Sequence, residues 1–370
     1  MKVVYFAKTS DHGPSSRYRI YQYLPYLQRQ RIHVHVYPLF GPLYFTMLKW
    51  RPTALRALGK ALYTIFRFVT RALNLMTVKK EDLVVIEGQL FPYLPPIVEK
   101  ALSRRNRIVL EFDDAIYLTP GHGRKIPSLL RLSAAAIVGN STLAKYASAH
   151  TPNVVLVPTV VDTDRFRPCD GERSSSKAAI DRPITIVWIG LAYNFRYLHI
   201  LLPTLRELQK DYRIVLRIVS SAAPVLPGID VEFRPWSYES EVRDLQTADI
   251  GVMPLLDDEW ARGKCGLKLL QYMAVGLPAL ASAVGVNCDI VRDGENGFLA
   301  RTEVDWHRHL TALCCNRELR RRIGDAARAT VEAQFSLTHW GPALALRYAD
   351  LIEDNKVTFA TPPVAQPIVR

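Results

Sequence analysis

The segment from Ala248 to Ala300 constrains the fold more than any other part of the chain. Within it, Ile250–Met253 is a short apolar run, as expected of a strand buried on both faces. Gly266 then opens a helical run that closes at Gly276, and the apolar residues 277–282 return as the next strand. A strand, a helix and a second strand in this order predict a parallel α/β unit.

The start of this helix has the properties of an anion-binding site. A helix that begins with glycine just after a strand presents unpaired backbone N–H groups and a positive dipole end. At about 100° per residue, Lys268 and Gln271 share one side, with Lys264 if the helix begins earlier. The other side is apolar: Leu267, Leu270, Met273 and Ala274. We therefore expect a phosphate at Gly266 and Lys268; the alternative is that the lysines form a solvated helix face.

Apolar runs typical of strands alternate with helical segments along the whole chain, which predicts parallel sheets with helices on both faces. The expected strands of the first half are 2–6, 33–37, 83–86, 108–112, 135–138 and 154–157. Those of the second half are 185–189, 215–219, 231–233, 250–253 and 279–282. Each half is therefore expected to be a Rossmann-like unit.

A polar stretch separates the two halves. Residues 169–183 contain a run of serines and no apolar periodicity, which predicts an exposed linker. We expect one domain over 1–168, a second over 184–340 and a disordered tail over 357–370. A chain of 370 residues, 49% of them hydrophobic, is long enough for two cores of ordinary size.

Several motifs resemble those of GT-B glycosyltransferases of family 4, also called group 1. Besides the segment described first, Pro158–Phe166 (PTVVDTDRF) and Asp293–Ala300 (DGENGFLA) stand in the family's order. The resemblance implies two Rossmann-like domains facing across a cleft, with a helix at about 341–356 crossing back to complete the first, acceptor-side domain. It also implies transfer of a sugar, with retention, from a nucleotide diphosphate donor to an acceptor hydroxyl, without a metal or other cofactor.

The chain departs from this family at one pair of positions. The family usually carries two glutamates eight positions apart, and here Gly263 and Gln271 stand in their places. Gln271 can still hydrogen-bond a ribose hydroxyl, whereas Gly263 has no side chain with which to contact a sugar. Asp257, Asp258 or Lys264 are the candidates to replace it. The two aspartates are adjacent, which is not the spacing of a metal-binding DxD motif.

Other residues would complete the donor site that the resemblance implies. Gly190 ends a strand, and Arg196 in the next loop either meets the diphosphate or remains solvated. Trp236 and Ser237 follow another strand, where relatives hold the nucleobase; the alternative for Trp236 is ordinary packing. The remaining expected donor-side residues are Gly13, Ser16, Arg17, Lys264, Cys265 (a small packing residue), Gly266 and Leu267.

The candidate catalytic residues are Lys268, Arg196, Asp113 and Asp114. Negative charge grows on the leaving phosphate during sugar transfer, so fixed cations and helix-start amides would stabilise the transition state. Asp113 and Asp114 end a strand, and adjacent strand residues point to opposite faces, so one of the two is expected to orient the acceptor or the donor sugar. The alternative is that both are structural capping residues.

The formal charge of +13 has a concentrated source. Residues 41–80 contain eight Lys or Arg and no Asp or Glu, and on a helical wheel the leucines cluster opposite Arg56, Lys60, Arg67 and Arg71. We expect residues 49–80 to lie on an anionic membrane with the basic face outward; the alternative is a helix whose apolar face packs on the sheet. No apolar run reaches the length of a membrane span. The prediction is therefore a cytoplasmic protein, peripheral on the inner face of the cytoplasmic membrane, with a lipid-linked or cell-envelope glycan acceptor.

Two other classes of function fit less of the sequence. An epimerase or hydrolase of the same fold, acting on a nucleotide sugar without an acceptor, would explain the missing glutamate pair. A nucleic-acid-binding protein would explain the charge, but the basic residues follow an amphipathic helix and no binding motif occurs. The five cysteines form no CxxC pair, which argues against a disulfide framework or a zinc site.

Overall fold

The computed structural model describes residues 2–47, 52–80, 82–169 and 182–353. Contacts divide these residues into two units. The first comprises the described residues up to Thr159, Gly263–Cys265 and those from Trp340 onward; the second comprises Val160–Arg262 and Gly266–His339. Most of the predicted linker and the whole predicted tail lie outside the described residues.

The first unit is built on a parallel six-stranded sheet with the order β2-β1-β3-β4-β5-β6. Its strands are β1 (Lys2–Thr9), β2 (His33–Phe40), β3 (Leu83–Glu87), β4 (Ile108–Phe112), β5 (Ala135–Val138) and β6 (Val154–Leu156). β3, β4 and β5 are buried along their whole length, because helices cover both faces of a parallel sheet.

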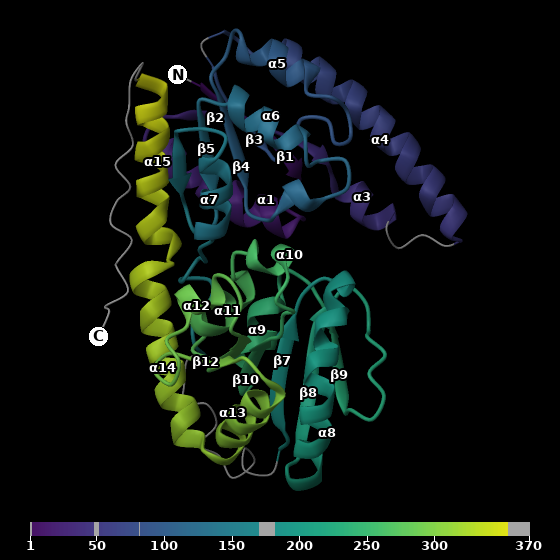
Figure 1. Ribbon diagram of the computed structural model, residues 1–370, viewed down its shortest axis with the longest axis vertical. Helices are drawn as coiled ribbons and strands as arrows, with labels where there is room; N and C mark the ends of the chain where they lie inside the picture. The colour runs from purple at the N-terminus through teal and green to yellow at the C-terminus, as the bar shows by residue number, and fades with distance from the viewer. Residues whose placement is uncertain (1, 48–51, 81, 170–181, 354–370) are drawn as a thin grey trace. The chain divides into compact units, whose positions relative to one another are not determined.

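The helices of the first unit connect these strands (Figure 1). They are α1 (Pro14–Arg19), η1 (Tyr21–Tyr23), α2 (Leu24–Arg29), α3 (Pro42–Met47), α4 (Thr53–Met76), α5 (Ile97–Ser103), η2 (Ile116–Leu118), α6 (Lys125–Leu132) and α7 (Ser141–Ser148). The end of the chain adds α15 (Leu337–Glu353). Tyr348 of α15 packs edge-on against Tyr5 with ring centres 5.9 Å apart, and Arg107 Nη1 donates to Leu351 O at 2.7 Å. These contacts join the far part of α15 to the first unit.

The second unit has its own parallel six-stranded sheet, in the order β12-β11-β10-β7-β8-β9. The strands are β7 (Ile184–Ile189), β8 (Ile214–Ser220), β9 (Val231–Pro235), β10 (Ile250–Met253), β11 (Ala279–Ser282) and β12 (Phe298–Ala300). The helical segments are η4 (Ala192–Leu201), α8 (Leu202–Asp211), α9 (Glu241–Gln246), α10 (Glu259–Arg262), α11 (Leu267–Ala274), α12 (Asn287–Ile290), α13 (Glu303–Cys315) and α14 (Arg317–Gln334).

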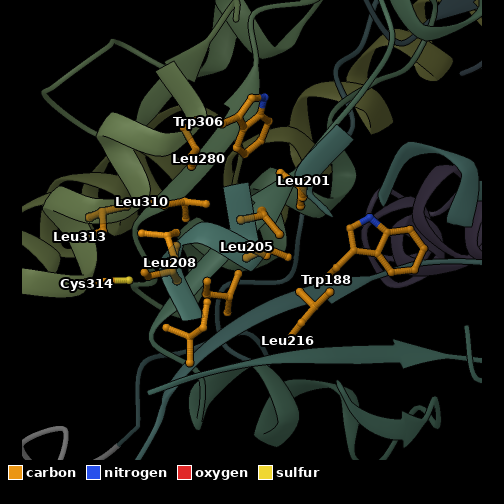
Figure 2. Close-up of a cluster of buried hydrophobic side chains, with 14 of the residues drawn as sticks. Trp188, Leu201, Leu205, Leu208, Leu216, Leu280, Trp306, Leu310, Leu313 and Cys314 are labelled. Carbon is orange, nitrogen blue, oxygen red and sulfur yellow. The ribbon is translucent and has the colours of Figure 1, made fainter. Parts of the chain in front are cut away.

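A compact apolar core holds this second sheet to its helices. Figure 2 shows Trp188 and Leu216 of the sheet together with leucines of η4 and α8, and Trp306, Leu310 and Leu313 of α13. Trp188 and Trp306 are 1% and 2% exposed, so this layer has little freedom to shift. The rigidity matters because Trp188 stands one residue before the end of β7.

The sequence predictions of the strands are confirmed. Each expected strand is present with bounds that agree within three residues, and the sheets are parallel as expected. β12 is not among the strands expected from the sequence. Among the residues that the structure describes, no helix is both long and apolar enough to cross a bilayer.

The orientation expected for α4 is wrong. Figure 1 shows α4 as a long helix at the edge of the first unit. Its basic side faces inward: Arg71 is 1% exposed and donates to Ala7 O, Tyr37 O and Leu90 O, at 2.5, 2.8 and 3.2 Å. Arg67 Nε donates to Leu39 O at 2.7 Å. The arginines satisfy backbone carbonyl groups, so the apolar side is the exposed one.

Candidate functional site

Helix α11 of the second unit begins at a glycine with two structural constraints. Gly266 has a φ of 72°, in the left-handed region that favours glycine. A Cβ at this position would also lie 2.4 Å from Ile290 Cδ1. The glycine turns the loop after β10 into the helix, whose first N–H groups have no partner within the helix. This end of α11 is therefore suited to an anion.

The end of β7 lies beside the same helix. A Cβ at Gly190 would lie 2.8 Å from Lys268 Cε and 2.7 Å from Trp188 Cη2, so the lysine side chain passes directly over the glycine backbone. Lys268 Nζ is 5.3 Å from the Trp188 ring centre, within the range of a cation–π interaction. Gly190 and Lys268, which the sequence identified separately, are thus adjacent at the carboxyl end of the sheet, where ligands bind in open α/β folds.

Tyr272 holds the two strands at this edge, and sequence reasoning missed it. Its Oη accepts a hydrogen bond from Ile189 N at 3.0 Å and donates to Val252 O at 3.3 Å. Burial raises the pKa of Tyr272, so the hydroxyl stays protonated. A Cβ at Gly251 would lie 2.5 Å from the Tyr272 ring. The lone glycine inside the apolar run of β10 was the signal that an aromatic ring packs there.

The two polar residues of α11 differ in their exposure to solvent. Lys268 is half-buried, whereas Gln271 is 4% exposed and lies inside the second unit. The helix begins at Leu267, so Lys264 is not part of it. Lys264 belongs instead to the first unit, where its Nζ is 3.9 Å from Asp114 Oδ1.

The candidate charged residues around α11 have local partners. Arg196 is exposed, and its Nη2 donates to Tyr197 Oη at 2.7 Å, a bond that raises the pKa of Arg196. Asp258 accepts a hydrogen bond from Ala261 N at 2.7 Å and so caps α10. Asp257 forms an exposed ion pair with Arg262 at 2.7 Å. Neither aspartate lies in a position that only a ligand explains.

Trp236 and Ser237 both hold the start of α9. The Trp236 indole N–H donates to Glu241 at 2.8 Å, and this glutamate is 2% exposed and pairs with Arg165 at 2.7 Å. Ser237 Oγ accepts from Ser240 N at 3.1 Å. The indole edge is therefore occupied by a carboxylate, which gives Trp236 a structural role in this conformation.

The glycine loop of the first unit folds back on its own strand. A Cβ at Gly13 would lie 2.0 Å from Thr9 Oγ1. Ser16 is fully buried; its hydroxyl accepts from Thr9 N at 3.0 Å and donates to Glu87 at 2.6 Å. Arg17 Nε donates to Asp11 O at 2.7 Å within the same loop. The three expected residues therefore fix the shape of this loop.

Two buried carboxylates lie at the ends of β3 and β4, and sequence reasoning missed both. Arg19 Nε pairs with Glu111 at 2.6 Å, with both side chains 2% exposed. Burial raises the pKa of Glu111 to about 8, against the opposing effect of Arg19. Burial likewise raises the pKa of Glu87, against its hydrogen bonds from Ser16 and Lys8 N. The signal in the sequence was a glutamate at the end, or one residue before the end, of an otherwise apolar strand, LVVIE and IVLEF.

Asp113 and Asp114 follow β4 beside this cluster. Asp113 accepts from Ser15 Oγ at 2.8 Å, and both aspartates are half-buried. Cys265, which belongs to the first unit, donates its Sγ proton to Asp113 O at 3.0 Å. Burial raises the pKa of Cys265 far above its ordinary value, so this thiol is not a nucleophile.

Gly263 has no room for a side chain. A Cβ on it would lie 2.6 Å from Ala115 Cβ and 2.9 Å from Ala115 N, well inside ordinary contact distance. Asn140 Nδ2 donates to the carbonyl oxygens of Gly263 and Lys264 at 3.0 and 2.9 Å. The glycine is thus explained by close packing of the backbone, and a glutamate would require that packing to change.

A family model matches the part of the chain that carries the Gly190 and Lys268 site. The model described as Glycosyl transferases group 1 covers residues 183–316, from β7 to the end of α13. All of the residues placed around α11 in the second unit fall inside this match.

Curated relatives are similar over part of their length. The chain is 27% identical over 214 residues to a D-inositol 3-phosphate glycosyltransferase of Streptomyces bingchenggensis, covering 50% of this chain and 45% of the relative. It is 27% identical over 232 residues to the enzyme of the same name from Nocardia farcinica, covering 56% and 49%. The chain spans about half the length of the curated relatives it matches.

Solved structures share the fold over almost the whole chain. Sucrose-phosphate synthase from Thermosynechococcus elongatus aligns with a TM-score of 0.64 at 15% identity, over 95% of this chain and 99% of that one. HepE of Anabaena in complex with UDP and glucose aligns with a TM-score of 0.66 at 15% identity, over 95% and 100%. A glycosyltransferase from Rickettsia africae aligns at 0.68 and 12% identity, over 96% and 99%. The fold is therefore that of the GT-B glycosyltransferases.

Proposed function

We propose that this chain, whose residues 183–316 match the model of the glycosyl transferases group 1 family, transfers a sugar from a nucleotide diphosphate sugar to an acceptor hydroxyl. The observation that carries the proposal is the adjacency of Gly190 and Lys268 at the start of α11. The glycine lets the backbone approach a diphosphate closely, and the lysine and the helix-start amides supply positive charge. The UDP bound to the Anabaena relative supports a nucleotide diphosphate as the donor.

In this proposal the second unit stabilises the leaving group. As the bond between sugar and phosphate breaks, negative charge grows on the diphosphate, and a cation held in place needs no reorganisation to meet it. Lys268 is held over Trp188 and Gly190, so its ammonium is positioned in advance. Arg196 is a second cation at this edge. We propose retention of anomeric configuration and a reaction without a resident metal or cofactor.

We further propose a lipid-linked or cell-envelope glycan acceptor, met at the inner face of the cytoplasmic membrane. The segment 41–80 has no Asp or Glu, and its exposed Lys79 and Lys80 support an anionic surface as partner. Asp113 is proposed to orient the acceptor hydroxyl or the donor sugar, because Ser15 fixes its carboxylate at 2.8 Å.

A transfer assay tests the proposal. The full chain is incubated with each common nucleotide sugar and a membrane extract, and products are followed by mass spectrometry. Sugar that appears on an extracted lipid or glycan supports transfer. One observation favours a second function: position 263 holds glycine where a glutamate is usual, and the packing against Ala115 leaves no space for a glutamate. Free sugar or an isomerised nucleotide sugar formed without extract would support the hydrolase or epimerase and refute transfer.

A further inference from the structure

Helix α4 exposes a continuous apolar face. It runs for 24 residues, about 36 Å at 1.5 Å per residue, at the edge of the first unit (Figure 1). Its large apolar residues recur at helical spacing and each is at least 50% exposed: Leu55, Leu58, Leu62, Ile65, Phe66, Val69, Leu73 and Met76. An apolar face of this length on a soluble surface indicates an interaction site.

The inner side of α4 fixes this orientation. Arg67 and Arg71 donate to carbonyl oxygens of the first unit, and turning the helix to bury its leucines would break these bonds and expose a buried guanidinium. Breaking them would leave several backbone acceptors without partners. The apolar face is therefore held outward by polar contacts on the opposite side.

The face is also hollowed where α4 meets α3. Met47 of α3 and the side chains of Leu55, Leu58, Leu62 and Phe66 line an apolar depression above Gly59. Tyr63 completes a lining that is almost entirely apolar, and an irregular hollow of this kind suits a partner that can change shape to fill it, such as acyl chains.

The charge around this face favours a lipid surface over a second copy of the chain. No acidic residue occurs between Gly41 and Lys80. Two copies packed face to face would bring like-charged segments together, which costs free energy. Anionic headgroups complement the same charges. The exposed Lys79 and Lys80, which follow the end of α4, are available to meet them.

We propose that α4 lies in the plane of a lipid bilayer with its apolar face inserted at the boundary between headgroups and acyl chains. Insertion of leucine side chains, rather than attraction to a basic outer face, then carries the binding. Attachment should therefore persist in high salt, because screening weakens charge contacts and leaves hydrophobic burial intact. The inference extends the proposed lipid-linked acceptor, and it is tested without any transfer reaction.

Vesicle flotation of the full chain tests this inference. The probes are phosphatidylcholine vesicles with 0 or 30% phosphatidylglycerol (roughly the anionic content of a membrane leaflet), in low and in high salt. The variant is Leu58→Glu with Ile65→Glu. The control is Val225→Glu with Val304→Glu in the second unit, where the native residues are 90% and 72% exposed. Both pairs add the same charge to exposed positions.

We expect wild type and control to float with vesicles in both salts, and the α4 variant to bind at least about tenfold more weakly. Binding that high salt abolishes would overturn the inference, as would equal binding of variant and control. A wild-type dimer without lipid that the α4 variant converts to monomer would also overturn it, because a second copy would then cover the face. Nucleoside diphosphate binding is measured in the same preparations and tests the donor site separately. A failure of vesicle binding can therefore be distinguished from a failure of donor binding.

Discussion

The Gly190→Ala substitution tests the candidate anion site with a single methyl group. The new Cβ would lie 2.8 Å from Lys268 Cε and 2.7 Å from Trp188 Cη2. Carbon atoms pack best at about 3.5–4.0 Å, so both contacts are too short by close to 1 Å and each must be relieved. Trp188 is 1% exposed within the core, whereas the lysine side chain ends in a half-buried ammonium. The lysine side chain can swing away, so its ammonium leaves the start of α11, whereas the contact with Trp188 remains and overpacks the core.

Two magnitudes follow from this displacement. Overpacking costs about 1–3 kcal/mol, partly offset by about 0.4–1 kcal/mol from the stiffer unfolded chain, so a net loss of about 1–2 kcal/mol in unfolding free energy is expected. A charge-assisted contact to a phosphate contributes about 1.5–3 kcal/mol, so its loss weakens nucleoside diphosphate binding by about 10–150-fold. The effect on binding should exceed the effect on stability.

Isothermal titration with UDP, or with whichever nucleoside diphosphate the wild type binds best, measures the loss of affinity, and urea unfolding measures the loss of unfolding free energy. Gly123→Ala is the matched control, because its Cβ would lie 3.6 Å from Tyr117 O, an ordinary contact. In a Lys268→Ala background, Gly190→Ala should have almost no further effect on affinity, since both changes remove the same ammonium. Unchanged affinity in the Gly190→Ala single variant, or fully additive losses in the double variant, would refute the site.

Three further substitutions test other parts of the molecule. Lys268→Ala should reduce nucleoside diphosphate affinity by at least about tenfold and leave thermal unfolding nearly unchanged, while Lys210→Ala, an exposed residue paired with Glu207, should affect neither. Glu87→Gln removes a buried carboxyl whose pKa is raised in the folded state. Such a group adds to the unfolding free energy at acid pH, and this contribution is lost as the pH rises through the folded-state pKa. Urea unfolding at pH 5 and 8 should therefore show the unfolding free energy of the variant rising relative to that of the wild type at pH 8. Arg71→Met should lower the unfolding free energy by about 2–4 kcal/mol and accelerate hydrogen exchange across α4, because three carbonyl groups lose their donor; unaltered exchange would contradict the anchoring role.

The strands could be predicted from sequence because parallel strands buried on both faces are uninterrupted apolar runs. β12 escaped prediction because three residues, Phe298–Ala300, carry too little pattern. Gly190 and Lys268 could each be selected by their positions at a strand end and a helix start. Their adjacency follows from the general rule that the carboxyl ends of parallel strands meet at one edge, so this part of the site was within reach of the sequence.

The buried carboxylates could not be predicted from the sequence. Glu87 and Glu111 lie near the carboxyl ends of two strands that are separated in sequence, and nothing local shows that they lie near each other and near Arg19. Trp236 shows the opposite case, in which the sequence suggests a ligand site and the structure shows a partner within the protein. An aromatic residue after a strand end fits a base-stacking site, but its indole nitrogen bonds to Glu241 five residues later. The sequence carried both residues without showing that they meet.

Helix α4 shows why periodicity alone could not decide which face is inside. A helical wheel separates an apolar from a basic side, and the usual rule places the apolar side inward. Here the carbonyl oxygens of Tyr37, Leu39 and Ala7 accept the arginines, so the basic side packs and the apolar side does not. Fully burying one large apolar side chain is worth about 1.5–3 kcal/mol, so eight half-exposed ones forgo on the order of 8 kcal/mol. That sum is comparable to the whole stability of a domain. A fold that leaves so much unburied while anchoring the opposite side is better explained by a partner on the apolar face than by inefficient packing.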